Sequence, residues 1–200
     1  MAGPPTPDAA ELRRLVRSSH PPFVEAVVAD ARLAARFRDE PPVGDGALAM
    51  VREVLRLCMV TDAFFAQTCY RAKAAAQAKG IPFVPRVLHR LAMRSAQVCI
   101  GDPVVVEAGV YLPHGQVVVD ALTRVRTGTT LSPFVTLGRV ASRPGGPDVG
   151  PLATIGTGAK VLGPVKVGAR AQVGANSVVL DDVPPDATAV GAPARVVGQG

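Results

Sequence analysis

Apolar residues in the first half of the chain recur every three or four positions, the spacing typical of amphipathic helices. Prolines and glycines, which do not continue a helix, separate these stretches. Five helical stretches are predicted: from a cap at Asp8 to Pro21, from Phe23 to before Pro41, from near Asp45 through Cys58, from Ala63 to Lys79, and from Pro85 to Arg94. The sequence thus predicts a helical N-terminal domain over residues 1–97.

The pattern changes at Val98, where β-branched residues and glycines replace helix formers and an apolar residue recurs at every sixth position. A fixed period of this kind indicates a solenoid, in which three short strands and tight corners make a coil of about 18 residues. We therefore predict an α+β protein with a left-handed parallel β-helix of hexapeptide repeats over residues 98–200. The predicted inward residues are Ile100, Val106, Leu112, then after one extra residue Val119, Val125, Leu131 and Leu137, and later Ile155, Val161, Val167, Val173 and Val179.

The six-residue period is interrupted once, over residues 139–148, where no apolar residue occupies the expected inward position. This stretch is rich in Gly and Pro and carries Arg139 and Arg143. It is predicted to be a loop outside the prism, where a solenoid would cover a ligand, although a passive insertion would leave the same pattern. The residues after Leu180 close the last coil and leave a short tail.

Composition and net charge limit the classes of function that the chain could have. Hydrophobic residues make up 48% of the chain but aromatic residues only 4%, so the core is built from Val, Ala and Leu. The net charge of +6 would attract a polyanion such as a nucleotide cofactor. No basic run is interleaved with aromatics, so we expect no nucleic-acid partner. No stretch reaches the roughly 18 apolar residues of a membrane span, so we expect a soluble protein with no membrane partner.

The cysteines and histidines do not form a metal-binding pattern. Cys58, Cys69 and Cys99 are odd in number and lack metal-ligand spacing, so we expect no disulfide framework, no metal and a reducing, cytoplasmic location. Only His114 lies in the predicted solenoid, which excludes a three-histidine zinc site within one subunit. The other two histidines, His20 and His89, lie in helical sequence and are interpreted as packing or surface residues.

Several segments, taken in order, resemble the serine O-acetyltransferases. They are the stretch from Tyr70 to Gly101, LPHGQVVV, PFVTLG, the loop, the hexapeptide run through VLDDVPP, and VGAPARVV, which together cover about the last 130 residues. Many hexapeptide acetyltransferases share VGAPARVV, whereas the preceding helical domain and the place of LPHG favour the serine enzymes. The resemblance implies an acyltransferase of cysteine biosynthesis that moves an acetyl group from acetyl-CoA to the hydroxyl of serine or a related amino acid.

His114 of LPHG stands where the family has its catalytic histidine, and the resemblance therefore makes it the general base. An imidazole suits this role because it accepts and releases protons near neutral pH. The alternative is an exposed corner histidine without a role in catalysis.

The residues that support this histidine in the family differ here. In the family an Asp precedes the histidine, and another Asp about fifteen residues upstream orients its ring. Pro113 and Cys99 occupy these two places. Either another acid orients His114 or the site has decayed. The acids considered for this role are Asp102, Glu107 and Asp120.

The family loop also carries an Arg-His-Pro stretch that helps to hold the amino acid, and the corresponding residues here are Gly145, Gly146 and Pro147. The acceptor is therefore expected to be held differently or to be a different alcohol. Cys99 could carry an acyl intermediate or be a buried structural thiol, and the structural thiol is favoured because no base motif accompanies Cys99.

The resemblance places acetyl-CoA in the groove between adjacent prisms. Small side chains allow the backbone to approach the pantetheine arm. The matching positions are Gly138, Thr157, Gly158, Ala159 and Ala175, and the candidates for the phosphates are Lys160 and Arg195, ahead of Lys166 and Arg170.

The resemblance further implies a homotrimer or a dimer of trimers that acts on a small-molecule alcohol. Two alternatives remain: an acetyltransferase for another small alcohol or sugar, and a catalytically inactive trimeric scaffold. In the family the partner of such a scaffold would be a cysteine synthase that grips the C-terminal tail. The tail VVGQG does not end in the Ile that those complexes bury.

Overall fold

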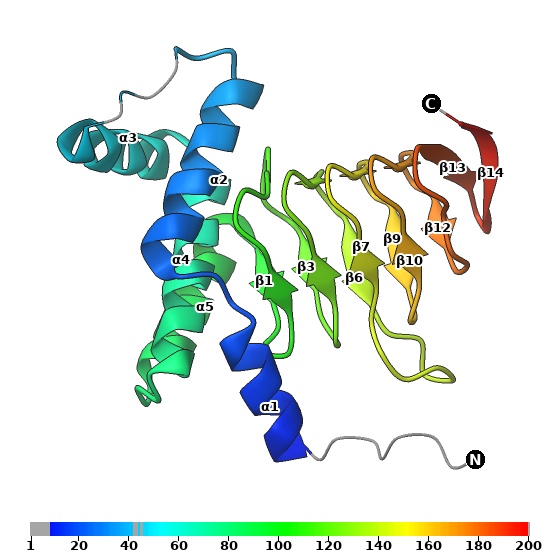
Figure 1. The fold of residues 1–200 in the computed structure, drawn as a ribbon, viewed down its shortest axis with the longest axis horizontal. Coiled ribbons are helices and arrows are strands. Elements are labelled where there is room, and N and C mark those ends of the chain that lie inside the picture. Colours follow the sequence, from blue (N-terminus) through cyan, green and yellow to red (C-terminus); the bar gives the residue numbers. More distant parts are fainter. Residues whose placement is uncertain (1–8, 42–43, 45, 200) are drawn as a thin grey trace.

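The computed structural model describes residues 9–41, 44 and 46–199, and it places five helices ahead of a three-sided column of short strands (Figure 1). The five predicted helices are confirmed, whereas the expected starts at Asp8 and Asp45 lie outside the described residues. No helix in the described ranges is long and apolar enough to cross a bilayer. The helices are α1 (Ala9–Ser18), α2 (Phe23–Phe37), α3 (Ala47–Val60), α4 (Asp62–Ala78) and α5 (Val84–Ala96).

The strands form three parallel sheets that make up the sides of a left-handed β-helix, as the period of six predicts. The first sheet contains β1 (Cys99–Ile100), β3 (Val118–Val119), β6 (Thr136–Gly138), β9 (Lys160–Leu162) and β12 (Val178–Val179). The second contains β2 (Val105–Val106), β4 (Arg124–Val125), β7 (Asp148–Val149) and β10 (Lys166–Val167). The third contains β5 (Thr130–Leu131), β8 (Thr154–Ile155), β11 (Gln172–Val173), β13 (Ala187–Gly191) and the antiparallel β14 (Ala194–Gln199).

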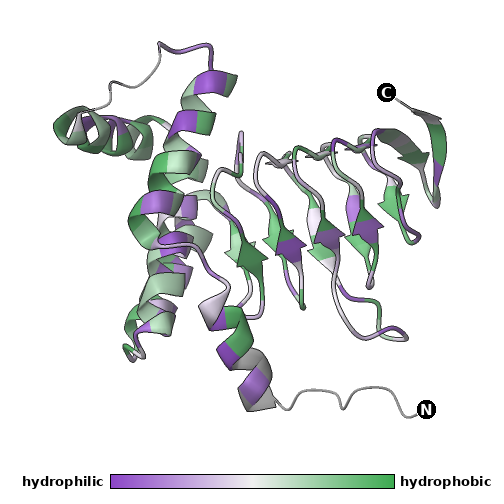
Figure 2. Ribbon diagram, in the orientation of Figure 1, coloured by the Kyte–Doolittle hydropathy of each residue, from purple (hydrophilic) through white to green (hydrophobic). Residues whose placement is uncertain are grey.

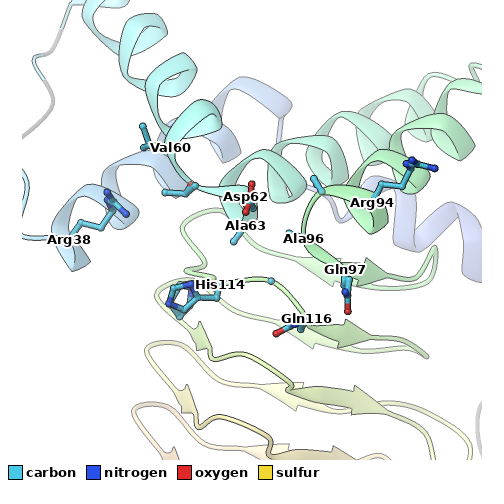
Figure 3. Close-up of a pocket in the computed structure, with 13 residues that line it drawn as sticks. Arg38, Val60, Asp62, Ala63, Arg94, Ala96, Gln97, His114 and Gln116 are labelled. Carbon is cyan, nitrogen blue, oxygen red and sulfur yellow. The ribbon is translucent and has the colours of Figure 1, made fainter.

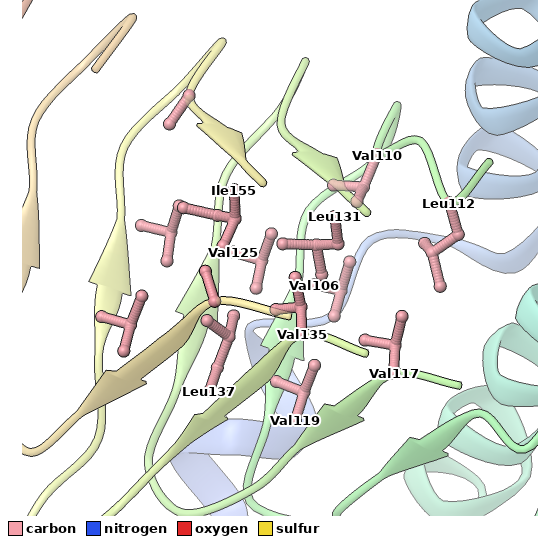
Figure 4. Close-up of a cluster of buried hydrophobic side chains, with 14 of the residues drawn as sticks. Val106, Val110, Leu112, Val117, Val119, Val125, Leu131, Val135, Leu137 and Ile155 are labelled. Carbon is pink, nitrogen blue, oxygen red and sulfur yellow. The ribbon is translucent and has the colours of Figure 1, made fainter. Parts of the chain in front are cut away.

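The inward positions predicted from the period of six are confirmed. All twelve of those side chains are buried, none with more than 5% exposure, and Figure 4 shows how side chains of successive coils meet inside the column. In Figure 2 the visible strands carry both hydrophobic and hydrophilic residues, because neighbouring residues of a strand point to opposite faces. One apolar residue per side and coil is thus enough to build the core.

The loop that leaves the column lies between β6 and β7. Twelve residues rather than six separate Leu137 from Val149, and Figure 1 shows the extra chain hanging below the coils. Arg143 ties this loop to the column by donating to the Leu180 carbonyl at 2.9 Å. Asp148, at the end of the stretch where the period lapses, belongs to β7.

The helices close the N-terminal end of the column. Residues of α4 and α5, such as Ala66, Tyr70 and Ala92, share one continuous buried cluster with the inward residues of the coils. The first coil would otherwise expose a row of backbone groups, since it has no preceding coil to pair with. Polar side chains from α2 and α4 bind those groups.

Asp30 of α2 and Arg71 of α4 form the centre of this polar cap. Both side chains are only 2% exposed, and Arg71 donates to the Asp30 carboxylate at 2.8 and 3.1 Å. The same carboxylate accepts the backbone N–H groups of Gly109 and Val110 at 2.9 and 3.0 Å. A buried ion pair is stable only when its remaining hydrogen-bonding capacity is met, and the first coil meets it here.

Four carbonyls of the first coil are bound from α4 by further side chains. Arg71 donates to Val106 and Glu107 at 2.5 and 2.7 Å. The other two are Val110, bound by Gln67 at 2.8 Å, and Ile100, bound by Lys73 at 2.7 Å. We call Asp30, Gln67, Arg71 and Lys73 the polar cap.

The polar cap should dominate stability. Asp30→Ala leaves the Arg71 guanidinium and two N–H groups buried without their acceptor, so we expect the free energy of unfolding to fall by about 3–5 kcal/mol in urea denaturation. Asp148→Ala is the matched control, because it breaks a two-bond pair with Arg126 that is only partly buried. That control should cost at most about 1 kcal/mol, and equal losses in the two variants would contradict the assignment.

His20, between α1 and α2, makes the stability depend on pH. Burial, reinforced by the charges of Arg71 and Lys73, lowers the pKa of His20 from 6.5 to about 4. Between these values the unfolded chain binds the proton and the folded chain does not, so stability falls as pH drops from about 6.5 to about 4. His20→Asn should flatten this part of the urea-midpoint profile relative to the native protein, and two parallel profiles would show that His20 does not contribute.

Candidate active site

His114 lies in a turn of the first coil that is held against the end of α5. The buried residues Leu112 and Val117 anchor the turn on both sides. The N–H of Gln116 donates to the Ala96 carbonyl at 2.7 Å. Gly115 allows this approach, because a Cβ at that position would lie 1.8 Å from the same carbonyl oxygen. The glycine of LPHG therefore brings an exposed histidine beside the helices.

A pocket of about 400 Å³ opens at this junction and contains His114 in its wall. Its other walls come from the α3–α4 junction and the end of α5 (Figure 3). Three charged side chains line it besides His114, namely Arg38, Asp62 and Arg94. Sequence reasoning missed all three, since they come from separate helices and share no motif.

None of the three acids considered from the sequence lines this pocket. Among the described residues, none of them has a hydrogen bond or ion pair to His114. Asp102 pairs with Lys73 at 2.7 Å, and although partial burial acts to raise its pKa, Lys73 holds that pKa below its ordinary value. Glu107 accepts from Arg124 and from the Thr127 N–H, each at 3.2 Å.

The three acids do not reach His114 because they lie at other corners of the column. Asp102 and Asp120 lie in turns that lead from the first sheet to the second, and Glu107 follows the second sheet. His114 lies in a turn that leads into the first sheet. The expectation that one of these acids orients His114 is therefore not met by contacts within this chain.

The structure also shows the surroundings of Gly146 and Cys99, two positions that depart from the family pattern. A Cβ at Gly146 would lie 2.8 Å from the Thr123 nitrogen, so the backbone of this loop has no room for a histidine side chain there. Burial, together with the charge of Asp120, raises the pKa of the Cys99 thiol against the opposing charge of Lys73. A thiol of raised pKa is a poor nucleophile, which favours a structural role for Cys99.

Turns of successive coils line up with the turn of His114 along one corner of the column. Phe134 N donates to the Gln116 carbonyl, Gly158 N to the Pro133 carbonyl and Asn176 N to the Thr157 carbonyl, at 2.8–2.9 Å. We call this corner, formed by residues 113–117, 132–135, 156–159 and 174–177, the His114 edge. It contains four positions expected to border the pantetheine arm, which are Thr157, Gly158, Ala159 and Ala175. Gly138, the fifth, ends β6 at a different corner.

The cations expected at the phosphates differ in their contacts. Lys160, the first residue of β9, donates to the Phe134 carbonyl at 2.6 Å and so lies beside the His114 edge. Arg195 on β14 is exposed, and its nearest acid, Asp181, is 3.9 Å away. Arg170 binds Asp186 through two bonds of 2.5 and 2.6 Å. Within the described ranges no group of His, Cys, Asp or Glu side chains is placed to hold a metal ion.

Solved serine acetyltransferases resemble this chain over most of its length. The soybean apoenzyme is 32% identical, with a TM-score of 0.73 over 90% of this chain and 71% of the soybean chain. The soybean enzyme complexed with serine is 33% identical over the same shares, with a TM-score of 0.72. A serine acetyltransferase in complex with CoA is 29% identical, with a TM-score of 0.72 over 94% of this chain and 75% of that chain.

Neither a protein-family model nor a curated protein sequence matches the chain. The two soybean structures, however, share its order of helices and hexapeptide coils over nine-tenths of its residues at identities above 30%. They confirm the resemblance indicated by the sequence. The chain therefore belongs to the serine acetyltransferase family of acyltransferases.

Proposed function

We propose that the protein transfers the acetyl group of acetyl-CoA to the hydroxyl of serine or a related amino acid, with His114 as the general base. The observation that carries this proposal is the place of His114. It lines a pocket large enough for a small acceptor and stands on the same edge as a row of turns with small side chains. The comparisons add that one family member has been solved with serine and another with CoA.

The proposed chemistry needs one proton acceptor. Bound acetyl-CoA supplies an activated thioester. His114 takes the proton of the acceptor hydroxyl while its oxygen attacks the thioester carbonyl, and it then returns that proton to the departing sulfur. The exposed imidazole is reached from the pocket and from the His114 edge, so both substrates have access to it.

The His114 edge is suited to a pantetheine arm. Its turns present Gly158 and Ala175, whose small side chains let an extended ligand approach the backbone. Arg195 is the better candidate for a phosphate, because among the described residues its charge is opposed only by Asp181, at 3.9 Å. Lys160 fixes the edge through its bond to Phe134 and keeps its charge beside the proposed arm.

One observation favours an alternative acceptor. The loop has no room for a histidine at Gly146, so the amino-acid grip of the family is missing from this chain. Another small alcohol or a sugar is therefore the second candidate, and a catalytically inactive scaffold is the third. The three unpaired thiols, Cys58, Cys69 and Cys99, favour a reducing compartment such as the cytoplasm.

Two single substitutions, one at His114 and one at Arg195, separate catalysis from the binding of acetyl-CoA. We expect His114→Ala to lower kcat about 100-fold or more while the affinity for CoA stays unchanged, because the imidazole acts only in proton transfer. Arg195→Ala should do the reverse, with a higher KM for acetyl-CoA and a kcat close to that of the native protein. The measurements are thiol release from acetyl-CoA and calorimetric titration with CoA.

Full turnover by His114→Ala would refute the general-base role. A native protein that binds CoA but releases no thiol with serine, other alcohols or sugars would instead support the scaffold. Release with a sugar and none with serine would select the second candidate.

We also propose that the protein forms a homotrimer or a dimer of trimers. Several large apolar side chains are exposed on the outside of the column, with exposures of 39–58% for Val118, Leu122, Phe134 and Leu152. Such side chains, one on a strand and three in corner turns, support contacts between the columns of neighbouring chains. Light scattering should give three or six times the chain mass of 20.6 kDa, and a stable monomer at micromolar concentration would contradict the proposal.

A further inference from the structure

The turns of the His114 edge share a backbone conformation that suits some of their residues better than others. One residue in each turn has a positive φ, between 55° and 74°, and these are Gln116, Phe134, Gly158 and Asn176. Glycine and asparagine enter this left-handed region readily, whereas a bulky aromatic residue rarely does. Phe134, with a φ of 62°, therefore has an unfavourable backbone conformation, and such conformations gather at functional sites.

The two neighbouring coils hold the backbone of Phe134 in place. Its N–H donates to the Gln116 carbonyl at 2.8 Å, and its own carbonyl accepts from Lys160 Nζ at 2.6 Å. The side chain, by contrast, is 53% exposed and belongs to neither buried apolar cluster of the described chain. Packing inside the column therefore gives no reason for an aromatic ring at this corner.

Other corners of the column show which way the ring leans. The side chain of Asn176 lies over Gly158 one coil earlier, and that of Leu152 lies over Gly128, because each occupies the space that a Cβ on the glycine would need. Both side chains thus lean towards the preceding coil. The coil that precedes Phe134 carries the candidate base, so we expect the ring to lie beside that turn.

The proposed function brings the two substrates to His114 from opposite sides. In Figure 3 the turn of His114 and Gln116 lies between the helices and the later coils. The acceptor pocket is on the helical side, and Gln116 lines it whereas Phe134 does not. The pantetheine arm would follow the later coils, past Gly158. Since Phe134 lies in the coil between Gly158 and His114, the thioester end of the arm has to pass its ring.

We propose that Phe134 is a specificity-determining residue that limits the acyl group of the donor to acetyl. The inference rests on the proposed function and concerns its donor side. The ring packs against the acetyl methyl group and fills the space that the further carbons of a longer acyl chain would need. This role gives a reason for a bulky side chain at a corner whose backbone favours glycine or asparagine.

The test compares acetyl-CoA, propionyl-CoA and butyryl-CoA as donors with serine as the acceptor. For the native protein we expect kcat/KM to fall about tenfold or more from acetyl-CoA to butyryl-CoA. Phe134→Asn should reduce this preference about tenfold, because asparagine suits the left-handed backbone and leaves the space beside the thioester open. Phe134→Tyr keeps the bulk of the ring and should keep the native preference.

Leu152→Asn is the matched control. Leu152 is likewise a large apolar corner residue with a positive φ of 61° and an exposure of 58%, but it lies between β7 and β8 at a different corner. The control should keep the native preference for acetyl-CoA. Equal losses of preference in Phe134→Asn and Leu152→Asn would overturn the proposal. So would a uniform loss for all three donors with a fall in oligomeric mass, which would assign Phe134 to contacts between columns.

Calorimetric titration with the three acyl-CoAs, without an acceptor, separates this inference from the proposed function. Tighter binding of acetyl-CoA than of butyryl-CoA by the native protein, with a smaller difference in Phe134→Asn, supports the limit even if turnover is slow. The same affinity ratio and the same kcat/KM ratio in both proteins would overturn the limit, while His114-dependent acetyl transfer would leave the proposed function intact. A native protein that binds none of the three donors would overturn both.

Discussion

The open edge of the first coil is the constraint on which the rest of the molecule depends. Each later coil donates and accepts backbone hydrogen bonds with its neighbours, but the first coil has a neighbour on one side only. The polar cap supplies the missing partners from α2 and α4, with Asp30 and Arg71 almost completely buried at its centre. Since an unsatisfied charge there is costly, the helices and the column are expected to fold as one unit.

The same docking creates the candidate active site. Asp30 holds Gly109 and Val110 just before the turn of His114, and Ala96 holds Gln116 just after it. The helices that cap the coil therefore also form two walls of the pocket, where they place Asp62 and Arg94. The column contributes His114 and the His114 edge, and the helical layer contributes the charged side chains of the pocket.

The sequence predicts the fold well because each inward residue, such as Val125 or Ile155, gives a local signal at a fixed period. The LPHG motif likewise identifies His114 as the candidate general base. The pocket charges escape prediction because only helix packing brings Asp62 and Arg94 to the same pocket. The misplaced acids were detectable, since Asp102 and Asp120 are 18 residues apart and so share one corner, whereas His114 falls on another.

A competition between acceptors tests the central claim that the joined helices and column form an amino-acid-selective acetyltransferase. The native protein would be given acetyl-CoA and an equimolar mixture of serine, serinol, 3-hydroxypropionate and glucose, and the acetylated products would be identified by mass spectrometry. The account predicts that acetylserine dominates and forms in step with free thiol. A dominant acetylated sugar or neutral alcohol, or thiol release without any acetylated acceptor, would contradict it.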